Sequence, residues 1–177
     1  MIVALVALVL LSAAACVTDD EKGKIEPEQK TQLTADMITV GGTYSYTGEP
    51  VCPDQNGTIS VVADGSHVDA SQFTYSYSDN VNAGTASVTV TAKESCTKVT
   101  GSATAHFEIA PATKTSTDIS ALQSLLDDPN YGMIYYSGDD ALAANSVLAV
   151  PEGKTLQLND GLTVNGKLTV DGTLIVY

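Results

Sequence analysis

Apolar and polar residues alternate with a period of two through the middle of the chain, from position 36 to about position 112. The clearest runs are 73–78, 86–92 and 103–109. A period of two sends successive side chains to opposite faces of a strand, so one face of each run is predicted to be buried. Turn residues interrupt the runs at short intervals, which is typical of an antiparallel β-sandwich. The residues predicted to face its core are Phe73, Tyr75, Tyr77, Ala86, Val88, Val90, Ala92, Ala103, Ala105, Phe107 and Ile109.

The pattern changes after position 112, where apolar residues recur at helical spacing. They are Ile119, Leu122 and Leu126. Ser116 or Thr117 supplies a side-chain oxygen that can cap the first turn, and a proline at position 129 ends the pattern. The segment predicts one short amphipathic helix, followed by strands within 132–138 and 145–161.

A spacing of six governs the last part of the chain. The residues at this spacing are Val150, Leu156, Leu162, Leu168 and Leu174. Asn165-Gly166 and Asp171-Gly172 are also typical of two-residue turns, so a β-hairpin is the alternative. A hairpin at Asn165-Gly166 would place apolar residues opposite polar ones, whereas parallel coils would stack each inward Leu or Val on its equivalent in the next coil. The spacing therefore favours a parallel β-solenoid.

The first fifteen residues form one apolar run that ends in small residues. A run of this length is typical of a secretory signal peptide and is too short to span a bilayer. Residues 13–16 resemble the lipobox of bacterial lipoproteins, in which the signal is removed before a cysteine that carries a diacylglycerol. The resemblance implies a signal peptide at 1–15 and a lipidated Cys16. An ordinary secretory signal with a chance cysteine is the alternative.

Residues 16–35 are polar and charged and contain no aromatic residue. Such a segment buries too little apolar surface to fold by itself, so it is predicted to be a flexible tether. Its acidic residues Asp19, Asp20 and Glu21 are similar to the surface-export signals of some Gram-negative lipoproteins. These features predict a protein of the bacterial cell envelope, anchored in the outer membrane through its lipid and exposed at the surface.

The charge of the chain argues against one large class of partner. The formal net charge is −13, and the eight basic residues are all lysines. A nucleic-acid-binding surface needs basic side chains that displace counterions from phosphates. We therefore expect no nucleic-acid partner, and an acidic surface suits an extracellular protein.

Two cysteines remain if Cys16 carries the lipid. Cys52 and Cys96 lie in the predicted sandwich, and cysteines of an exported chain commonly form disulfides. A zinc site is the alternative, but neither residue belongs to a CxxC pair, and His67 and His106 are the only histidines. The sequence predicts a disulfide between Cys52 and Cys96, no metal and no cofactor.

Three stretches, 46–51, 77–92 and 107–112, resemble the bacterial Ig-like repeats of large cell-surface proteins. The resemblance includes an NAG turn followed by alternating Thr and Val. Modules of this family are usually stalks or spacers, so 36–112 is expected to be an Ig-like β-sandwich with that role. Cys96 stands where the family usually has an aromatic residue, which fits a disulfide that replaces an aromatic anchor in the core.

Residues 117–161 resemble the N-terminal cap of right-handed parallel β-helices, in which a helix covers the first coil. We therefore expect 113–177 to form a capping helix and the first, incomplete coils of a parallel β-helix. A helix packed on a small mixed sheet is the alternative. Because about three coils are needed for a stable stack, we expect the chain to be the N-terminal part of a longer protein or a product of an early stop. A self-associating end is the third option.

Candidate catalytic chemistry is sparse in this sequence. It contains no GxSxG, no HExxH and no glycine-rich phosphate loop. Asp127-Asp128 and Asp139-Asp140 are candidates for paired carboxylates or calcium ligands. Adjacent acids of this kind are more often solvated loop residues, and we expect that here.

Tyrosines alternate along two predicted strands, at Tyr44, Tyr46, Tyr75 and Tyr77. Aromatic faces stack on sugars, but a sandwich without Trp needs such residues in its core, and we expect them there. The chain is thus predicted to be non-catalytic, a lipid-anchored surface protein whose stalk presents a solenoid for adhesion or for binding an extracellular glycan or protein. The alternative is the front end of a β-helix enzyme acting on polysaccharide, with its active site beyond residue 177.

Overall fold

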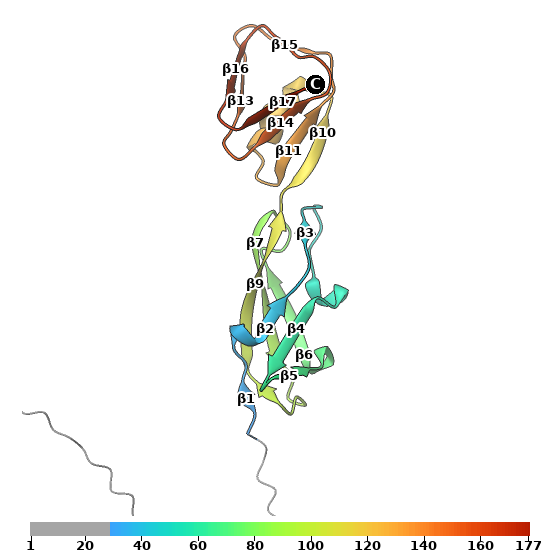
Figure 1. Cartoon of the computed structure of the whole chain (residues 1–177), viewed down its shortest axis with the longest axis vertical. Coiled ribbons are helices and arrows are strands. Elements are labelled where there is room, and N and C mark those ends of the chain that lie inside the picture. The colour runs from blue at the N-terminus through green and yellow to red at the C-terminus, as the bar shows by residue number, and fades with distance from the viewer. Residues whose placement is uncertain (1–28) are drawn as a thin grey trace, which may run out of the picture.

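The fold is mainly β, as predicted, and consists of two parts that lie end to end (Figure 1). The computed structural model describes residues 29–177. The lower part in Figure 1 contains 29–110, and the upper part contains 112–177. The chain passes between them at Pro111, directly after strand β9. The described N-terminal end lies at the foot of the lower part, far from the upper part.

Two sheets and one short strand pair make up the lower part. A three-stranded antiparallel sheet has the order β2 (Ile38–Val40), β4 (Ile59–Ala63) and β5 (Ser66–Val68). The other sheet has the order β3 (Tyr44–Ser45), β9 (Ser102–Ala110), β7 (Gly84–Ala92) and β6 (Phe73–Ser78), in which only β3 and β9 are parallel. The remaining elements are the parallel pair β1 (Thr31–Gln32) and β8 (Val99–Thr100) and the 3-10 helices η1 (Ala35–Met37), η2 (Pro53–Asn56) and η3 (Ala70–Gln72).

The core of the lower part is built from the alternating residues of its long strands. Ala86, Val88 and Val90 of β7 are fully buried, and Phe107 and Ile109 of β9 pack in the same cluster. Their neighbours along each strand are exposed or half-buried. The inward and outward faces predicted from the period of two are therefore confirmed for these strands.

The folded part begins earlier than the sequence predicts. Thr31 pairs with Val99, and Leu33 is only 2 % exposed in the core of the lower part. The tether predicted for residues 16–35 therefore does not extend beyond about position 30. A single leucine in a polar stretch shows no periodicity, although burying it contributes about 1.5–3 kcal/mol.

All strand pairs of the upper part are parallel. Its largest sheet has the order β10 (Ala112–Ser116), β11 (Tyr131–Tyr136), β14 (Thr155–Leu158) and β17 (Thr173–Val176). The other two sheets are pairs, β12 (Ala141–Leu142) with β15 (Thr163–Val164) and β13 (Val147–Val150) with β16 (Lys167–Val170). The chain visits the three sheets in turn and then returns to the first, one strand further on.

The register of these pairs explains the spacing of six. Leu156 of β14 pairs with Leu174 of β17, three six-residue units further along the chain. The strands on either side of Asn165-Gly166 do not pair with each other, because β15 pairs with β12 and β16 with β13. The hairpin alternative is therefore wrong. Each six-residue unit supplies one side of a coil, and the apolar residues of successive coils lie above one another.

The predicted helix is present as α1 (Ile119–Asp127), with Leu122 and Leu126 fully buried. Its N-cap is Asp118, whose carboxylate accepts the backbone N–H of Ser120 at 2.8 Å. The predicted cap at Ser116 or Thr117 is therefore wrong by one or two residues. An anionic acceptor also interacts favourably with the positive end of the helix dipole, which favours the aspartate.

Candidate functional site

The candidate site is the outer surface of the four-stranded parallel sheet. Its strands β10, β11, β14 and β17 lie side by side in the upper part of Figure 1. Register places two rows of outward side chains across its strands. The first row is Thr113, Met133, Thr155 and Thr173, and the second row is Thr115, Tyr135, Gln157 and Ile175. We call these eight residues the sheet face.

Burial confirms which side of the sheet these residues occupy. Ile134, Tyr136, Leu156 and Leu158 alternate with the sheet-face residues of β11 and β14 and are at most 4 % exposed. The sheet-face residues themselves are exposed or half-buried. Because parallel strands lie about 4.8 Å apart, each row forms a regular ladder of side chains across the sheet.

The sheet face carries no charged side chain, in a chain whose net charge is −13. Its four threonine hydroxyls, one amide and one phenol both donate and accept hydrogen bonds. Met133, Ile175 and the ring of Tyr135 add apolar contact area. Gln157 also donates to Asn159 Oδ1 at 2.7 Å, which fixes the orientation of its amide. This mixture suits a neutral ligand that has many hydroxyl groups and some apolar surface.

Family models, curated proteins and solved structures give no match to this chain. Among residues 29–177, no helix is long and apolar enough to cross a membrane. The predicted signal peptide and the predicted lipidation site Cys16 lie outside the described residues.

The predicted disulfide between Cys52 and Cys96 is not formed, and both thiols are free. Val51, next to Cys52, bonds to Asn80 just beyond the end of β6, whereas Cys96 bonds to Lys93 beside the start of β6. The two cysteines therefore lie at opposite ends of a six-residue strand, a separation of about 20 Å. A disulfide requires Cα atoms within about 7 Å, so this fold excludes the bond.

The tyrosines of the lower part pack against its core, as predicted, rather than forming an open sugar-binding surface. Tyr44 donates to the Gly41 carbonyl at 2.6 Å and also contacts Thr58 Oγ1 at 2.6 Å. Tyr77 donates to Asp54 Oδ1 at 2.5 Å. The pKa of Tyr77 lies well above its usual value. Burial is the larger cause, and this hydrogen bond is the second.

The acidic candidates do not converge on a metal site. Asp127 accepts Gln123 Nε2 at 2.9 Å, and Asp128 accepts the backbone N–H of Asn130 at 2.9 Å, so both stabilise the end of α1. Within the described part of the chain, no three acidic, histidine or cysteine side chains are grouped so that they could hold a metal ion. His67 and His106 each bond to a serine hydroxyl on the neighbouring strand.

The junction between the two parts, close to the predicted boundary at 112/113, contains contacts that the sequence did not predict. Asn130 Oδ1 in the upper part accepts the Ala83 N–H of the lower part at 2.8 Å. Tyr131 packs edge-to-face on Tyr46 with ring centroids 5.7 Å apart. Lys154 holds this loop by donating to the Tyr131 carbonyl at 2.5 Å.

Proposed function

We propose that this chain is a lipid-anchored protein of the bacterial cell surface, in which an Ig-like stalk presents a short parallel β-solenoid as a non-catalytic binding module. In this proposal the solenoid contacts an extracellular glycan through the sheet face. The observation that carries the proposal is the sheet face itself, two regular ladders of uncharged side chains on a strongly acidic protein.

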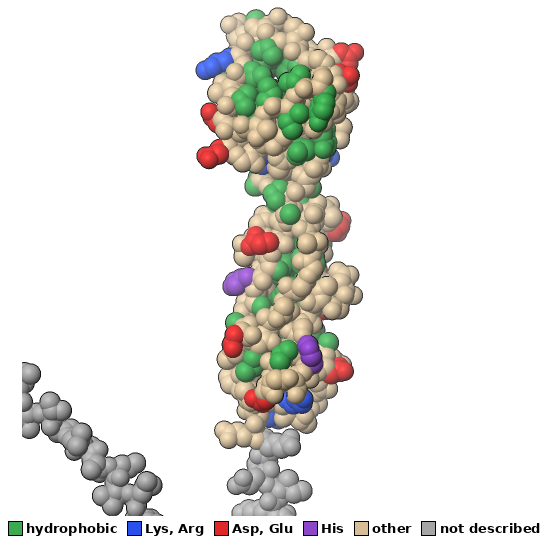
Figure 2. Space-filling model, in the orientation of Figure 1, with side chains coloured by type: hydrophobic (Ala, Val, Ile, Leu, Met, Phe, Trp, Pro, Cys, Tyr) green, Lys and Arg blue, Asp and Glu red, His purple; other side chains and the backbone are tan. Residues whose placement is uncertain are grey.

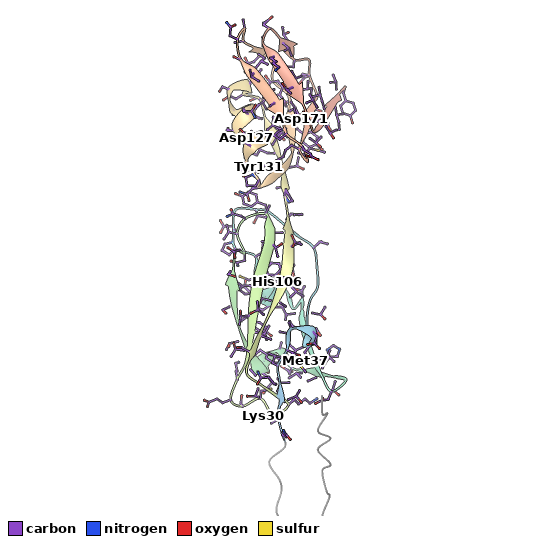
Figure 3. All side chains as sticks on the ribbon, turned by 90° about the vertical axis from the view of Figure 1, so that its left-hand side faces the viewer. Lys30, Met37, His106, Asp127, Tyr131 and Asp171 are labelled. Carbon is purple, nitrogen blue, oxygen red and sulfur yellow. The ribbon has the colours of Figure 1, made fainter. Side chains whose placement is uncertain are left out.

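The end-to-end arrangement supports the stalk role. Lys30 lies at the foot of the molecule, next to the segment that would lead to the lipid, and Tyr131 lies at the base of the upper part (Figure 3). A hydrogen bond and an aromatic contact join the two parts at the junction. The length of the lower part thus separates the sheet face from the tether. A spacer of this kind would lift a binding surface away from the membrane.

The parallel pairing and the capping helix support the interpretation of the upper part as a solenoid. Each coil passes through three sheets, and the helix covers the interior at the first coil with Leu122 and Leu126. The two sheets of the lower part enclose one core, which supports the interpretation of this part as an Ig-like sandwich. The uncharged side chains of the sheet face favour a neutral ligand, because an anionic glycan would be repelled by the acidic protein.

A charge placed on the sheet face tests the proposal. We expect full-length protein to bind to at least one member of a panel of immobilised neutral polysaccharides, and Thr155→Asp to weaken that binding by about tenfold or more, since a carboxylate would be desolvated under the ligand. Thr169→Asp is the matched control, because Thr169 is also half-buried but points outward from β16 on a different sheet. Equal losses in both variants, or no binding by the unchanged protein, would refute the sheet-face proposal.

A further inference from the structure

The linker between the two parts is a single residue. Pro111 stands between β9, which ends at Ala110, and β10, which begins at Ala112. Its ring fixes the backbone φ angle at about −65° and leaves only ψ free to rotate. Both neighbours are held in place, because the Ala110 carbonyl accepts the Tyr46 N–H at 2.9 Å and the Ala112 N–H donates to the Asn130 carbonyl at 2.8 Å. The linker therefore has little freedom of its own.

The upper part also packs against this linker and against the top of the lower part. A Cβ atom added to Gly132 of β11 would lie 3.3 Å from the Cβ of Pro111, so the two residues are in close contact. The ring of Tyr131 meets that of Tyr46 at an interplanar angle of 82°. Figure 2 shows apolar side chains at the narrow waist between the two parts. A bend at Pro111 would expose this apolar surface to water.

Asn130 connects three segments at this waist. Its N–H donates to Asp128 Oδ1 at 2.9 Å, which fixes it to the end of α1. Its carbonyl holds Ala112 at the start of β10, and its side-chain Oδ1 accepts the Ala83 N–H of the lower part at 2.8 Å. The amide that bridges the two parts is therefore carried by a backbone that is bonded on both sides. We call Pro111, together with the side chains of Tyr46, Asn130 and Tyr131, the joint.

One lysine links the joint to the sheet face. The half-buried Lys154 donates through Nζ to the carbonyls of Asp128 and Tyr131, at 2.6 and 2.5 Å. Hydrogen bonds from a charged donor are stronger than those between neutral groups. Lys154 directly precedes Thr155, the first residue of β14 and a member of the sheet face. The loop that reaches the lower part is thus fixed to the strand that carries the surface.

We propose that the joint is rigid and that Asn130 is a positioning residue, which holds the sheet face in one direction relative to the stalk. Two parts that share a small interface usually move relative to each other. A linker of one proline, bonded on both sides and bridged by two side-chain contacts, removes that freedom here. The inference does not depend on what the sheet face binds, because it concerns only the orientation of the two parts.

Residual dipolar couplings of backbone N–H groups test the proposal on the full chain carrying Cys16→Ser, which lacks the proposed lipidation site. Parts that move as one body share one alignment in a dilute liquid crystal. We expect the couplings of residues 31–110 and 112–177 to fit a single alignment tensor. Two tensors of different magnitude would reveal a hinge at Pro111 and would overturn the proposal.

The double variant Asn130→Ala, Tyr46→Leu removes both side-chain contacts across the joint, and we expect the tensors of its two parts to differ in magnitude. Asn130→Asp keeps the oxygen that accepts the Ala83 N–H, so this variant should retain the single tensor. The matched control is Asn56→Ala with Tyr75→Leu, which makes the same exchanges at an exposed asparagine and a half-buried tyrosine in η2 and β6, away from the joint (Figure 1).

Couplings fitted within each part separately check that both parts of every variant keep their folds. A single tensor in the joint variant would show that these contacts do not hold the orientation. Loss of the single tensor in the control as well would show that the effect is not specific to the joint. Either result would overturn the proposal.

Discussion

Gly172 offers the sharpest test of the coil stacking. Its φ lies outside the left-handed region, so alanine is permitted by the backbone at this position. The added Cβ would nevertheless collide with the carbonyl oxygens of Pro151 and Lys154 in the preceding coil. The Lys154 carbonyl also accepts the Thr173 N–H at 2.9 Å, so moving it away breaks a hydrogen bond between coils.

The magnitude follows from three contributions. Overpacking against backbone costs about 1–3 kcal/mol, and the lost hydrogen bond costs about 1 kcal/mol. Replacing glycine by alanine offsets about 0.4–1 kcal/mol by restricting the unfolded chain. We therefore expect Gly172→Ala to lower the free energy of unfolding of the upper part by about 1–4 kcal/mol.

Urea denaturation followed by circular dichroism measures this change, and hydrogen exchange with mass spectrometry localises it to residues 141–177. Gly161→Ala is the matched control, because nothing lies within 4 Å of its added Cβ. We expect it to be neutral or to stabilise by up to about 1 kcal/mol. If the two substitutions had the same effect, the corner at Gly172 would not be packed on a preceding coil and the stacking argument would fail.

Three further predictions concern other contacts. Gln123→Ala should lower the unfolding free energy by about 1–3 kcal/mol in urea titrations, because both backbone groups of Ala149 lose their partner; an unchanged midpoint would show that α1 does not cap this edge of β13. The pKa of Tyr77 is raised in the folded state, so its neutral phenol contributes stability below the unfolded pKa of about 10, and this stability is lost as the pH rises above that value. Tyr77→Phe should therefore flatten the decrease of the thermal unfolding midpoint at alkaline pH. Identical pH profiles of the unchanged protein and the variant would contradict this. Thiol labelling of the folded protein should modify Cys52 before Cys96, which is 1 % exposed, and a mass spectrum that shows an internal disulfide would refute the arrangement.

The parts of the fold that sequence predicts well are those in which position along the chain directly sets orientation. In β7 a period of two places Ala86, Val88 and Val90 on one face whatever their partners are. The six-residue spacing works similarly, because each unit makes one side of a coil. The rejection of the hairpin at Asn165-Gly166 needed only the identity of directly opposed residues.

The remaining features depend on contacts between distant segments. The disulfide prediction rested on the number of cysteines in an exported chain, and it failed because Cys52 and Cys96 lie at opposite ends of β6. Leu33 was assigned to the tether because no neighbour repeats its apolar character. Thr155 and Thr173 become neighbours on the sheet face only through the lateral register of β14 and β17, which no local pattern specifies.

The central claim is that the sheet face stands outside the cell. Labelling of intact expressing cells with a membrane-impermeant maleimide tests it most directly, with Thr155→Cys introduced into a Cys52→Ser background. We predict that this cysteine is modified on intact cells, and that Cys16→Ser releases the labelled protein from the cell-bound fraction. Modification that occurs only after the cells are broken would place the sheet face inside the envelope and would contradict the proposed function.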